Sequence, residues 1–388
     1  MKIIALIEYI YYNNVYNMKI KRRAYKMRSF VPYELPIDKL IEPMEFYNEL
    51  ISASTNLGKY QVMLKKSKVN EYFLITPFSL QEAVQSSKIE GTQATFDEVL
   101  EFEIDKTIKN DDAQEVLNYY EALKYGERTL SKLPISTRLF KKLHEILLSE
   151  GVRGQNRAPG EYRSIQNFIG PEGCTIDTAT YIPPEPQIVD SCMSNLEKYI
   201  NDPRDDLHSL VRIAIIHAQF ETIHPFLDGN GRIGRILIPL YLYDVKLIDS
   251  PNLFISEVLE KDKHKYYRLL NGTRKEDDGW NEWIKFFLES VNKQVQKNIN
   301  LIEELDELYE NDLEKAMKLI NSTNVVDLMK AMFQKPIFNV KTISALTGIP
   351  DTTCRRYLFT LEDEKIIFSD NKMRNRKYYY YNLLDLLR

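Results

Sequence analysis

The sequence predicts a mainly helical protein that carries a β-hairpin flap and ends in a small winged helix-turn-helix domain. Apolar residues recur at helical spacing in two successive segments, 207–218 and 233–241. The stretch 158–186 interrupts this pattern, because it is rich in Gly, Pro, Thr and aromatic residues and has no helical period. Beyond residue 322 we expect a helix, a second helix, a glycine turn, a third helix and two β-rich pieces. This order is typical of a winged helix-turn-helix.

Changes in composition along the chain predict four parts. They are a poorly defined N-terminal extension (1–29), an N-terminal helical region (30–120), a helical core with connector helices (121–321) and a winged helix-turn-helix domain (322–388). The long charged stretch from Trp280 to about Ile320 is the expected connector. The extension is a poor signal peptide, because its basic cluster follows the apolar stretch and no small-residue cleavage site is evident. Met18 and Met27 remain open as the start of translation.

The composition excludes several classes of protein. The 388 residues contain no apolar run near the ~20 residues that a membrane span needs, so we expect no membrane partner. A net charge of −4 confines any nucleic-acid contact to a local basic patch. The three cysteines are odd in number and far apart, which favours a reducing, cytoplasmic environment over a disulfide framework. The glycine-rich phosphate loop, the kinase motifs and the HExxH zinc motif are all absent.

The segment HPFLDGNGRIGR, residues 224–235, is the strongest chemical signal. It joins the two periodic segments, so we place Gly229, Asn230 and Gly231 at the entry to a helix. Such an entry offers unpaired backbone N–H groups and the positive end of the helix dipole to an anion. Arg232 and Arg235 share one face of the first turn, where cations are unfavourable unless an anion lies between them. The segment therefore predicts a phosphate site.

Two further side chains of the segment suit reaction at a phosphate. Asp228 beside an anion site makes sense as a Mg²⁺ ligand, since Mg²⁺ takes one or two protein carboxylates together with phosphate oxygens. His224 is the one group there able to accept a proton near neutral pH. Together the residues describe attack by a hydroxyl on a metal-bound nucleotide phosphate. Each feature alone is more often structural, but their order on one helix entry favours a site.

A second stretch, SLQEAVQSSKIEGT, reads as a helix of about three turns that begins with a capping box at Ser79 and ends at Gly91. Glu90 falls at its C-terminal end, where a carboxylate costs ~0.3–1 kcal/mol, so a compensating cation is expected. Ser86 lies one turn earlier on the same face. Taken alone, Glu90 is better explained as an exposed, tolerated residue.

The first segment resembles the signature of the Fic family, His-x-Phe-x-(Asp/Glu)-Gly-Asn-Gly-Arg-x-x-Arg, at every fixed position, Phe226 included. Ser86-x-x-x-Glu90-Gly91 is similar to the inhibitory motif of that family, in the form that precedes the core. The resemblance covers roughly residues 30–320. It implies a Fic-type helical core that moves AMP from ATP onto a protein Ser, Thr or Tyr hydroxyl and releases pyrophosphate.

The resemblance also implies roles for individual residues. His224 would be the base, Asp228 the Mg²⁺ ligand, and Asn230 and Arg232 phosphate binders. Glu90 would pair with Arg235 and block the seat of the ATP γ-phosphate. The flap would hold the target protein by strand addition. Several points stay open: the identity of the target protein, for which the chain itself is one candidate, the removal of AMP, the use of another nucleotide-like donor, and a homodimer.

Tyr267 and His217 each have both a functional and a structural interpretation. Tyr267 and Asn271 stand at i and i+4 and are candidates to line adenine, although a core role for Tyr266 or Tyr267 is nearly as well supported. His217 precedes His224 by seven residues on an apolar helix, and we interpret it as a satisfied core histidine.

The competing function is a DNA-binding regulator in which the Fic-like core only senses nucleotide. Residues 322–388 hold eleven basic residues against seven acids, a local charge of +4. The most basic spot is the expected wing, with Lys372, Arg374, Arg376 and Lys377, and Arg355 and Arg356 lie on the expected recognition helix. This charge is modest for a DNA-binding domain, and a protein-docking module would need less.

Overall fold

The computed structural model describes residues 29–388, except for 108, 150, 172, 203–204 and 276–277. The predicted N-terminal extension 1–29 therefore lies almost wholly outside the described residues. The fold is mainly helical, as predicted. No helix in the described part of the chain is long and apolar enough to cross a membrane.

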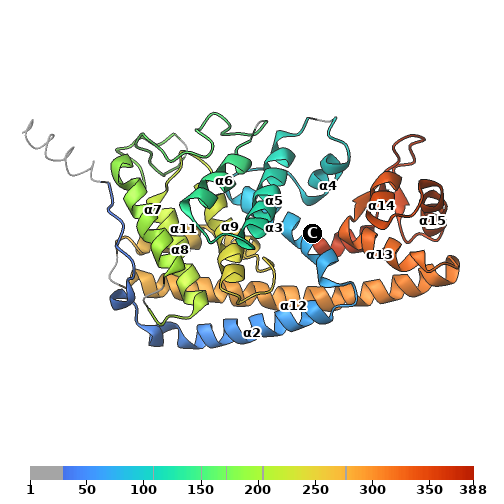
Figure 1. Ribbon diagram of the computed structural model, residues 1–388, viewed down its shortest axis with the longest axis horizontal. Helices are drawn as coiled ribbons and strands as arrows, with labels where there is room; N and C mark the ends of the chain where they lie inside the picture. Colours follow the sequence, from blue (N-terminus) through green and yellow to red (C-terminus); the bar gives the residue numbers. More distant parts are fainter. Residues whose placement is uncertain (1–28, 108, 150, 172, 203–204, 276–277) are drawn as a thin grey trace, which may run out of the picture.

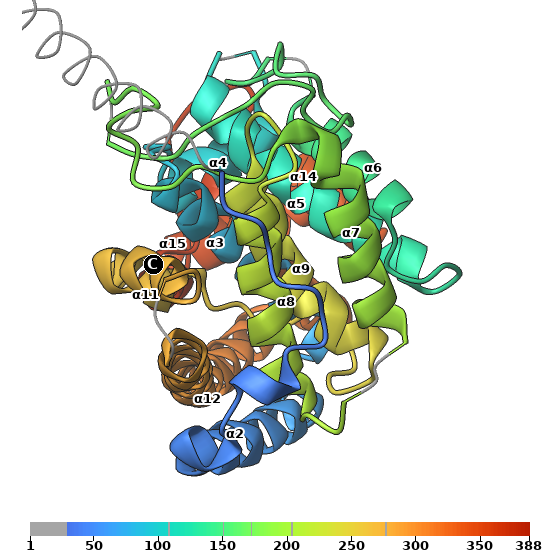
Figure 2. The same cartoon turned by 90° about the vertical axis from the view of Figure 1, so that its left-hand side faces the viewer.

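The centre of the molecule is the pair α8 (Ser209–Ile223) and α9 (Asn230–Asp244), which pack against each other. Every residue of α8 from Leu210 to Ile223 is buried, as expected for a helix that is enclosed on all sides. Other helices pack against this pair: α3 (Glu71–Ile89), α5 (Asp111–Leu130), α6 (Thr137–Leu147), α7 (Pro186–Asn201) and α11 (Lys263–Gly272) (Figure 2). The short helix α10 (Ser256–Lys261) packs against α3.

Two long helices form the base of the molecule. The predicted connector is α12 (Gly279–Leu319), a single helix of 41 residues, and α2 (Tyr47–Lys66) packs along it (Figures 1 and 2). Short 3-10 turns, η1 (Asp38–Leu40) and η2 (Pro43–Phe46), precede α2. Because the buried face of α12 continues from Trp280 to Ala316, this helix packs along the whole base and is more than a spacer.

The prediction for the helix that carries Ser86 and Glu90 was wrong at its N-terminus. Helix α3 begins at Glu71, and its cap is Asn70, whose side chain accepts a hydrogen bond from the backbone N–H of Tyr72. Ser79 lies inside α3 and is buried, so it caps nothing. The Ser-x-x-Glu pattern misleads here because the same spacing also occurs within a helix. The C-terminal end is as predicted: α3 ends at Ile89, and Gly91 has a φ of +99°.

The segment 158–186 is an irregular flap held by one β-bridge between Ile169 and Tyr181. The hairpin geometry is thus limited to this bridge, in which Ile169 and Tyr181 exchange backbone hydrogen bonds of 2.8 and 3.0 Å. Ile165 and Phe168 are exposed on the flap.

The C-terminal residues form helices around a small antiparallel sheet of strand order β1-β3-β2. The elements are α13 (Asn324–Gln334), β1 (Ile337–Phe338), α14 (Val340–Thr347), α15 (Asp351–Asp363), β2 (Phe368–Ser369), β3 (Tyr378–Tyr379) and α16 (Tyr381–Leu387). The three predicted helices and two β-rich pieces are present, whereas β1 and α16 were not anticipated from the sequence. Gly348 has a φ of +71° at the turn between α14 and α15.

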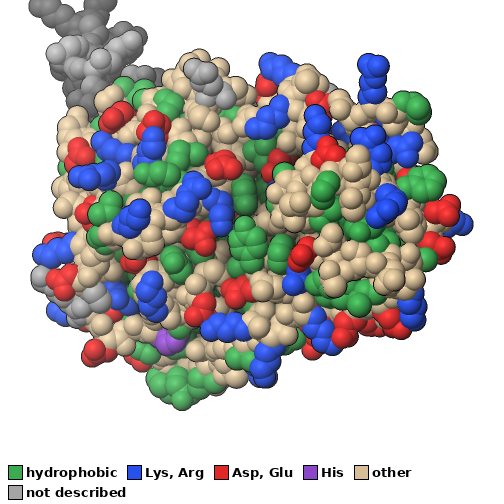
Figure 3. Space-filling view, turned by 45° about the vertical axis from the view of Figure 1, so that its right-hand side comes forward, with side chains coloured by type: hydrophobic (Ala, Val, Ile, Leu, Met, Phe, Trp, Pro, Cys, Tyr) green, Lys and Arg blue, Asp and Glu red, His purple; other side chains and the backbone are tan. Residues whose placement is uncertain are grey.

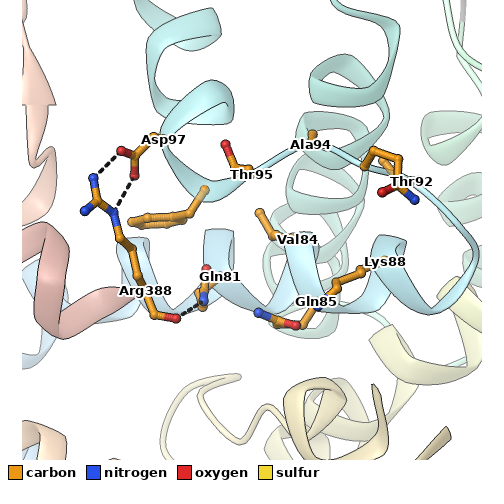
Figure 4. A pocket seen from close by; sticks show the side chains of 11 residues that line it. Gln81, Val84, Gln85, Lys88, Thr92, Ala94, Thr95, Asp97 and Arg388 are labelled. Atoms are coloured by element: carbon orange, nitrogen blue, oxygen red, sulfur yellow. Dashed lines mark hydrogen bonds and ion pairs between the residues drawn. The ribbon is translucent and has the colours of Figure 1, made fainter. Parts of the chain in front are cut away.

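Ion pairs hold this C-terminal part against α4 (Phe96–Ile104). Lys335 pairs with Glu103 at 2.5 Å, and Lys377 pairs with Glu101 at 2.7 Å. The Arg388 guanidinium contacts Asp97, and the Arg388 carbonyl accepts a hydrogen bond from Gln81 of α3 (Figure 4). Lys377, which the sequence placed in the basic wing, is therefore buried against Glu101 and withdrawn from the surface.

Candidate active site

The predicted motif forms a tight junction between α8 and α9. His224 ends α8 in the left-handed conformation, with φ +49°, and Gly229 begins α9 with φ +74°. Phe226 is fully buried and stacks on the His144 ring at a centroid distance of 3.8 Å. The Asn230 side chain closes the loop, because it accepts from Phe226 N at 2.8 Å and donates to Phe226 O at 2.9 Å. Asn230 therefore orders the junction through its side chain.

Gly231 permits a close approach to the first turn of α9. A Cβ at this position would collide with the Glu90 carboxylate and would come within 2.9 Å of Arg235 Nη1. Arg235 of α9 and the Glu90 carboxylate from the end of α3 thus lie where an anion would approach the backbone of Gly231.

Arg235 is held by the end of α3. Its Nη2 donates to Glu90 Oε1 at 2.7 Å, and its Nε donates to Ser86 Oγ at 2.7 Å. The Ser86 carbonyl accepts a further hydrogen bond from Nη2 at 3.0 Å, while Nη1 has no hydrogen-bond partner among the described residues. The structure therefore brings together Ser86, Glu90 and Arg235, which the sequence separates by up to 149 positions.

The ion pair keeps Glu90 charged. Burial alone would raise the pKa of Glu90, but the charge and hydrogen bond of Arg235 outweigh it, so this pKa lies below its usual value. The same pairing raises the pKa of Arg235 against the effect of burial. Because Glu90 keeps a side-chain exposure of 30% at the helix end, an anionic ligand could displace it.

Arg232 is held by two carboxylates, Glu115 and Asp228. Its Nη1 donates to Glu115 Oε1 of α5 at 2.5 Å, and its Nη2 lies 3.5 Å from Asp228 Oδ1. The Arg232 side chain is 1% exposed, and its Nε has no hydrogen-bond partner within the described ranges. Both motif arginines are thus buried, each against a carboxylate from the N-terminal helices.

His224 is a buried and neutral imidazole. Burial and the nearby charges of Arg274 and Arg163 lower the pKa of His224 to about 3. Arg163, from the flap, donates from Nε to the His224 carbonyl at 2.9 Å and so fixes the backbone beneath the ring. The imidazole is therefore uncharged at neutral pH, and its Nδ1 has no hydrogen-bond partner among the described residues. This is the form that can accept a proton.

Asp228 fits a site shared between protein and phosphates. Its Oδ1 accepts from Gly229 N at 2.6 Å, and its Oδ2 faces Gly154, where a Cβ would come within 2.8 Å. Across residues 29–388, apart from the gaps, no group of three His, Cys, Asp or Glu side chains could hold a metal. A single half-exposed carboxylate beside a phosphate site is nevertheless the kind of ligand that Mg²⁺ takes when phosphate oxygens and water complete its shell.

The adenine prediction rests on α11. Tyr267 is 37% exposed, and its ring packs on Tyr266 at a centroid distance of 5.0 Å. Tyr266 is a core residue, because its hydroxyl lies 2.9 Å from His217 Nε2. The other nitrogen of His217 lies 3.0 Å from the Gly234 carbonyl, so the interpretation of His217 as a satisfied core histidine is confirmed. Asn271 accepts from Arg274 at 2.9 Å.

Sequence reasoning missed three charged neighbours of the site: Glu115, Arg153 and Glu221. Glu115 holds Arg232, and Arg153 Nη2 donates to the Glu90 carbonyl at 3.2 Å. Glu221 is buried next to Gly234, and burial raises its pKa to about 7 against the charge of Arg235. None of the three stands in a recognisable motif, so only the packing of the helices could reveal them.

Two buried arginines, a carboxylate and a neutral imidazole surround a glycine-lined helix entry, an arrangement that suits a phosphate ligand. The sequence comparisons give the family that the chain is similar to. Residues 47–128 match the Fic/DOC family N-terminal region, and residues 134–242 match the Fic/DOC family. The two matches follow one another along the chain: the motif 224–235 lies in the second, and Ser86, Glu90 and Glu115 lie in the first.

Relatives and solved structures extend this finding. The protein adenylyltransferase Fic of Drosophila grimshawi is 30% identical over 199 residues, which are 49% of this chain and 37% of that protein. The protein of the same name from Nematostella vectensis is 28% identical over 190 residues, or 48% of this chain and 39% of its own length. The chain therefore spans well under half of these two relatives.

Two solved structures show the same fold. A Fic family protein from Desulfovibrio desulfuricans G20 superposes with a TM-score of 0.56 at 21% identity, covering 88% of this chain and 96% of that one. A Fic domain containing signaling protein from Bacteroides thetaiotaomicron gives a TM-score of 0.52 at 19% identity, over 65% of this chain and 97% of its own.

Proposed function

We propose that this protein is a protein adenylyltransferase, which transfers AMP from ATP to a Ser, Thr or Tyr hydroxyl of a target protein and releases pyrophosphate. The observation that carries the proposal is the α9 entry, where backbone N–H groups, Arg232 and Arg235 converge beside His224. The relatives named adenylyltransferase support the same reaction class.

In the proposed in-line displacement, each residue of the site has a separate role. Neutral His224 takes the proton of the attacking hydroxyl as its oxygen forms a bond to the α-phosphorus. The bond from that phosphorus to the bridging oxygen breaks, and pyrophosphate leaves with the electron pair. Arg232 and the α9 N–H groups stabilise the phosphate charge in a buried setting. Asp228 would hold Mg²⁺, which would offset the negative charge of the phosphates.

The Glu90–Arg235 ion pair restrains this reaction in the proposal. By the resemblance to the Fic family, Arg235 would bind the terminal phosphate of ATP, but Glu90 accepts a hydrogen bond from its Nη2 at 2.7 Å. A phosphate bound there must displace the carboxylate or seat elsewhere. The wild-type protein is therefore expected to transfer AMP slowly until Glu90 moves.

Incubation with α-labelled ATP and Mg²⁺, followed by mass spectrometry of the protein itself and of a host lysate, tests the reaction class. The expected product is a mass gain of one AMP on a hydroxyl side chain, lost when EDTA removes the metal. The matched control is the Glu90→Gly protein, which removes the restraint. The absence of AMP transfer by both proteins, with intact ATP recovered, would reject the proposal.

The C-terminal domain favours a second function, the binding of duplex DNA. A groove of about 660 Å³ lies between the start of α14, α15 and the 370–377 loop. Its charged lining consists of one acid, Asp351, and five basic residues: Lys341, Arg355, Lys372, Arg374 and Arg376. Figure 3 shows Lys and Arg side chains gathered at the upper right of this face. Phosphate oxygens are the complementary ligand for such a lining.

The basic residues of this groove differ in whether they already form an ion pair. Lys372 pairs with Asp370 at 3.2 Å and Arg376 with Glu362 at 3.3 Å, whereas Lys341, Arg355 and Arg374 form no ion pair with a described acid. Met373 at the tip of the loop is 95% exposed. A gel-shift titration with pooled genomic duplex at low salt tests this function. A shift that weakens steeply with salt is expected, and no shift at low salt would exclude it.

A further inference from the structure

Glu115 lies between the N-terminal helices and the site, and its surroundings are unusual for an acid. It is 1% exposed on α5, yet a single oxygen, Oε1, accepts three hydrogen bonds. The donors are Arg232 Nη1 at 2.5 Å, Thr92 Oγ1 at 3.0 Å and Arg153 Nη2 at 3.4 Å. A buried carboxylate held in this way has a fixed position, because moving it would leave several polar groups unpaired.

Glu115 is fixed more firmly than Glu90, although each of them pairs with a motif arginine. The Glu115 side chain is 2% exposed and stands inside a helix, whereas the Glu90 side chain is 30% exposed at a helix end. Glu90 can therefore be exchanged for a ligand, while Glu115 stays paired with Arg232.

The pairing with Glu115 leaves Arg232 able to bind phosphate. A guanidinium has five N–H donors, and Glu115 accepts from Nη1 alone. The Arg232 Nε is buried and has no hydrogen-bond partner in the described part of the chain. Glu115 binds Nη1 of Arg232, and Asp228 lies close to Nη2. Because the two acids contact different nitrogens, together they fix the plane of the guanidinium. Arg232 itself stands in the first turn of α9, at the helix entry.

We propose that Glu115 is a positioning residue for AMP transfer: it orients the Arg232 guanidinium toward the phosphates of the nucleotide. This inference rests on the proposed function, since Arg232 must act on a phosphate. Thr92 and Arg153 fix Glu115 in turn, and Arg153 also donates to the Glu90 carbonyl at 3.2 Å. One buried carboxylate thus ties the arginine of the core to the turn that carries Glu90.

The test uses the full chain in the Glu90→Gly background, so that the Glu90 restraint does not mask the rate. Glu115→Ala is expected to lower AMP transfer per folded molecule about 10²-fold, the scale of a misplaced reacting group. Glu115→Gln keeps an acceptor oxygen for Arg232 but loses the charge, so we expect a loss of only about tenfold. In an Arg232→Ala protein, Glu115→Ala should change the rate by no more than about twofold, since both residues act through one guanidinium.

Asp312→Ala is the matched control. Asp312 is a 2% exposed acid on α12 that accepts a hydrogen bond at 2.7 Å from the hydroxyl of Tyr380, a residue of the C-terminal part. It should destabilise the fold without altering the rate per folded molecule. If Glu115 has a merely structural role, Glu115→Ala should likewise leave the rate per folded molecule unaltered. That result would overturn the proposal, and so would a rate loss that is as large in the Arg232→Ala protein as in the Glu90→Gly parent.

Calorimetric titration with ATP and Mg²⁺ separates this inference from the proposed function. Glu115→Ala should weaken ATP binding about tenfold, as expected for the loss of an oriented charge-assisted contact. This readout does not depend on transfer, so a parent protein that binds ATP without labelling any target rejects the transferase and still tests Glu115. Equal ATP affinity in the parent and Glu115→Ala would contradict the positioning role.

Discussion

The α8–α9 junction and the C-terminal domain both carry clustered cations, but they use them differently. At the junction, Arg232 and Arg235 are 1% exposed and each pairs with a carboxylate from another helix. In the C-terminal domain, Lys341, Arg355 and Arg374 line an open groove, while Lys335 and Lys377 pair with α4. Burial gives the first set a defined geometry for one ligand, and exposure gives the second a diffuse field. Charge count alone therefore does not identify a site.

The largest effect is expected at the junction from His224→Ala. Loss of the general base should lower AMP transfer by about 10²–10⁴-fold while the fold and ATP binding persist. Labelling with α-labelled ATP in the Glu90→Gly background measures it. His264→Ala, which removes an exposed histidine of α11, is the control and should leave the rate unchanged. Unchanged labelling by a folded His224→Ala protein would remove the catalytic assignment.

The ion pair at Arg235 should give the next largest effect. Glu90→Gly is expected to raise transfer by about 5- to 150-fold, the range of a typical coupling free energy. Arg235→Ala should be slow with or without Glu90, because the phosphate clamp is missing in both. If Glu90→Gly with Arg235→Ala labels as fast as Glu90→Gly alone, the pairing is not what restrains the enzyme.

The pH dependence of stability separates the two regions, because all five histidines precede residue 265. Burial lowers the pKa of His217 to about 4. The stabilising contribution of neutral His217 is fully present above pH ~6.5. It falls as the pH is lowered, because His217 becomes protonated in the unfolded chain while it stays neutral in the folded state. Between pH 7 and pH 5 this single group should cost about 2 kcal/mol.

His217→Gln tests this contribution directly. Urea unfolding of the variant should depend less on pH between 7 and 5 than that of the wild type, although the variant is less stable at pH 7 because the contacts with Gly234 and Tyr266 change. Parallel pH dependence in the two proteins would mean that His217 is protonated in the folded state.

The smallest effects are expected in the C-terminal groove. Removing Arg374 by Arg374→Ala should reduce the slope of log affinity against log salt for duplex DNA by about one unit. Lys377→Ala should leave that slope unchanged, since Lys377 is 6% exposed and pairs with Glu101. Equal changes of slope in the two variants would show that the groove of the folded protein does not select the contacts.

Sequence patterns over a few residues were sufficient to predict the features that depend only on neighbouring residues. The junction 224–235 was placed correctly between two helices, because glycines and helical periodicity act over a few residues. The position of Glu90 at a helix end was also read correctly, whereas the start of the same helix at Ser79 was wrong, since a capping pattern has no meaning inside a helix. Asn230 shows a subtler limit: its side chain serves the Phe226 backbone, which residue type alone does not reveal.

The sequence by itself determined the mainly helical class and the helix entry at Gly229, because each depends on neighbours a few positions apart. Only the tertiary structure decided which acid meets which arginine. Glu115 and Arg232 lie 117 positions apart, and Lys377 and Glu101 lie 276 apart. Long-range pairing depends on how whole helices pack, and no local pattern encodes the partner of a charge that is buried by a distant element.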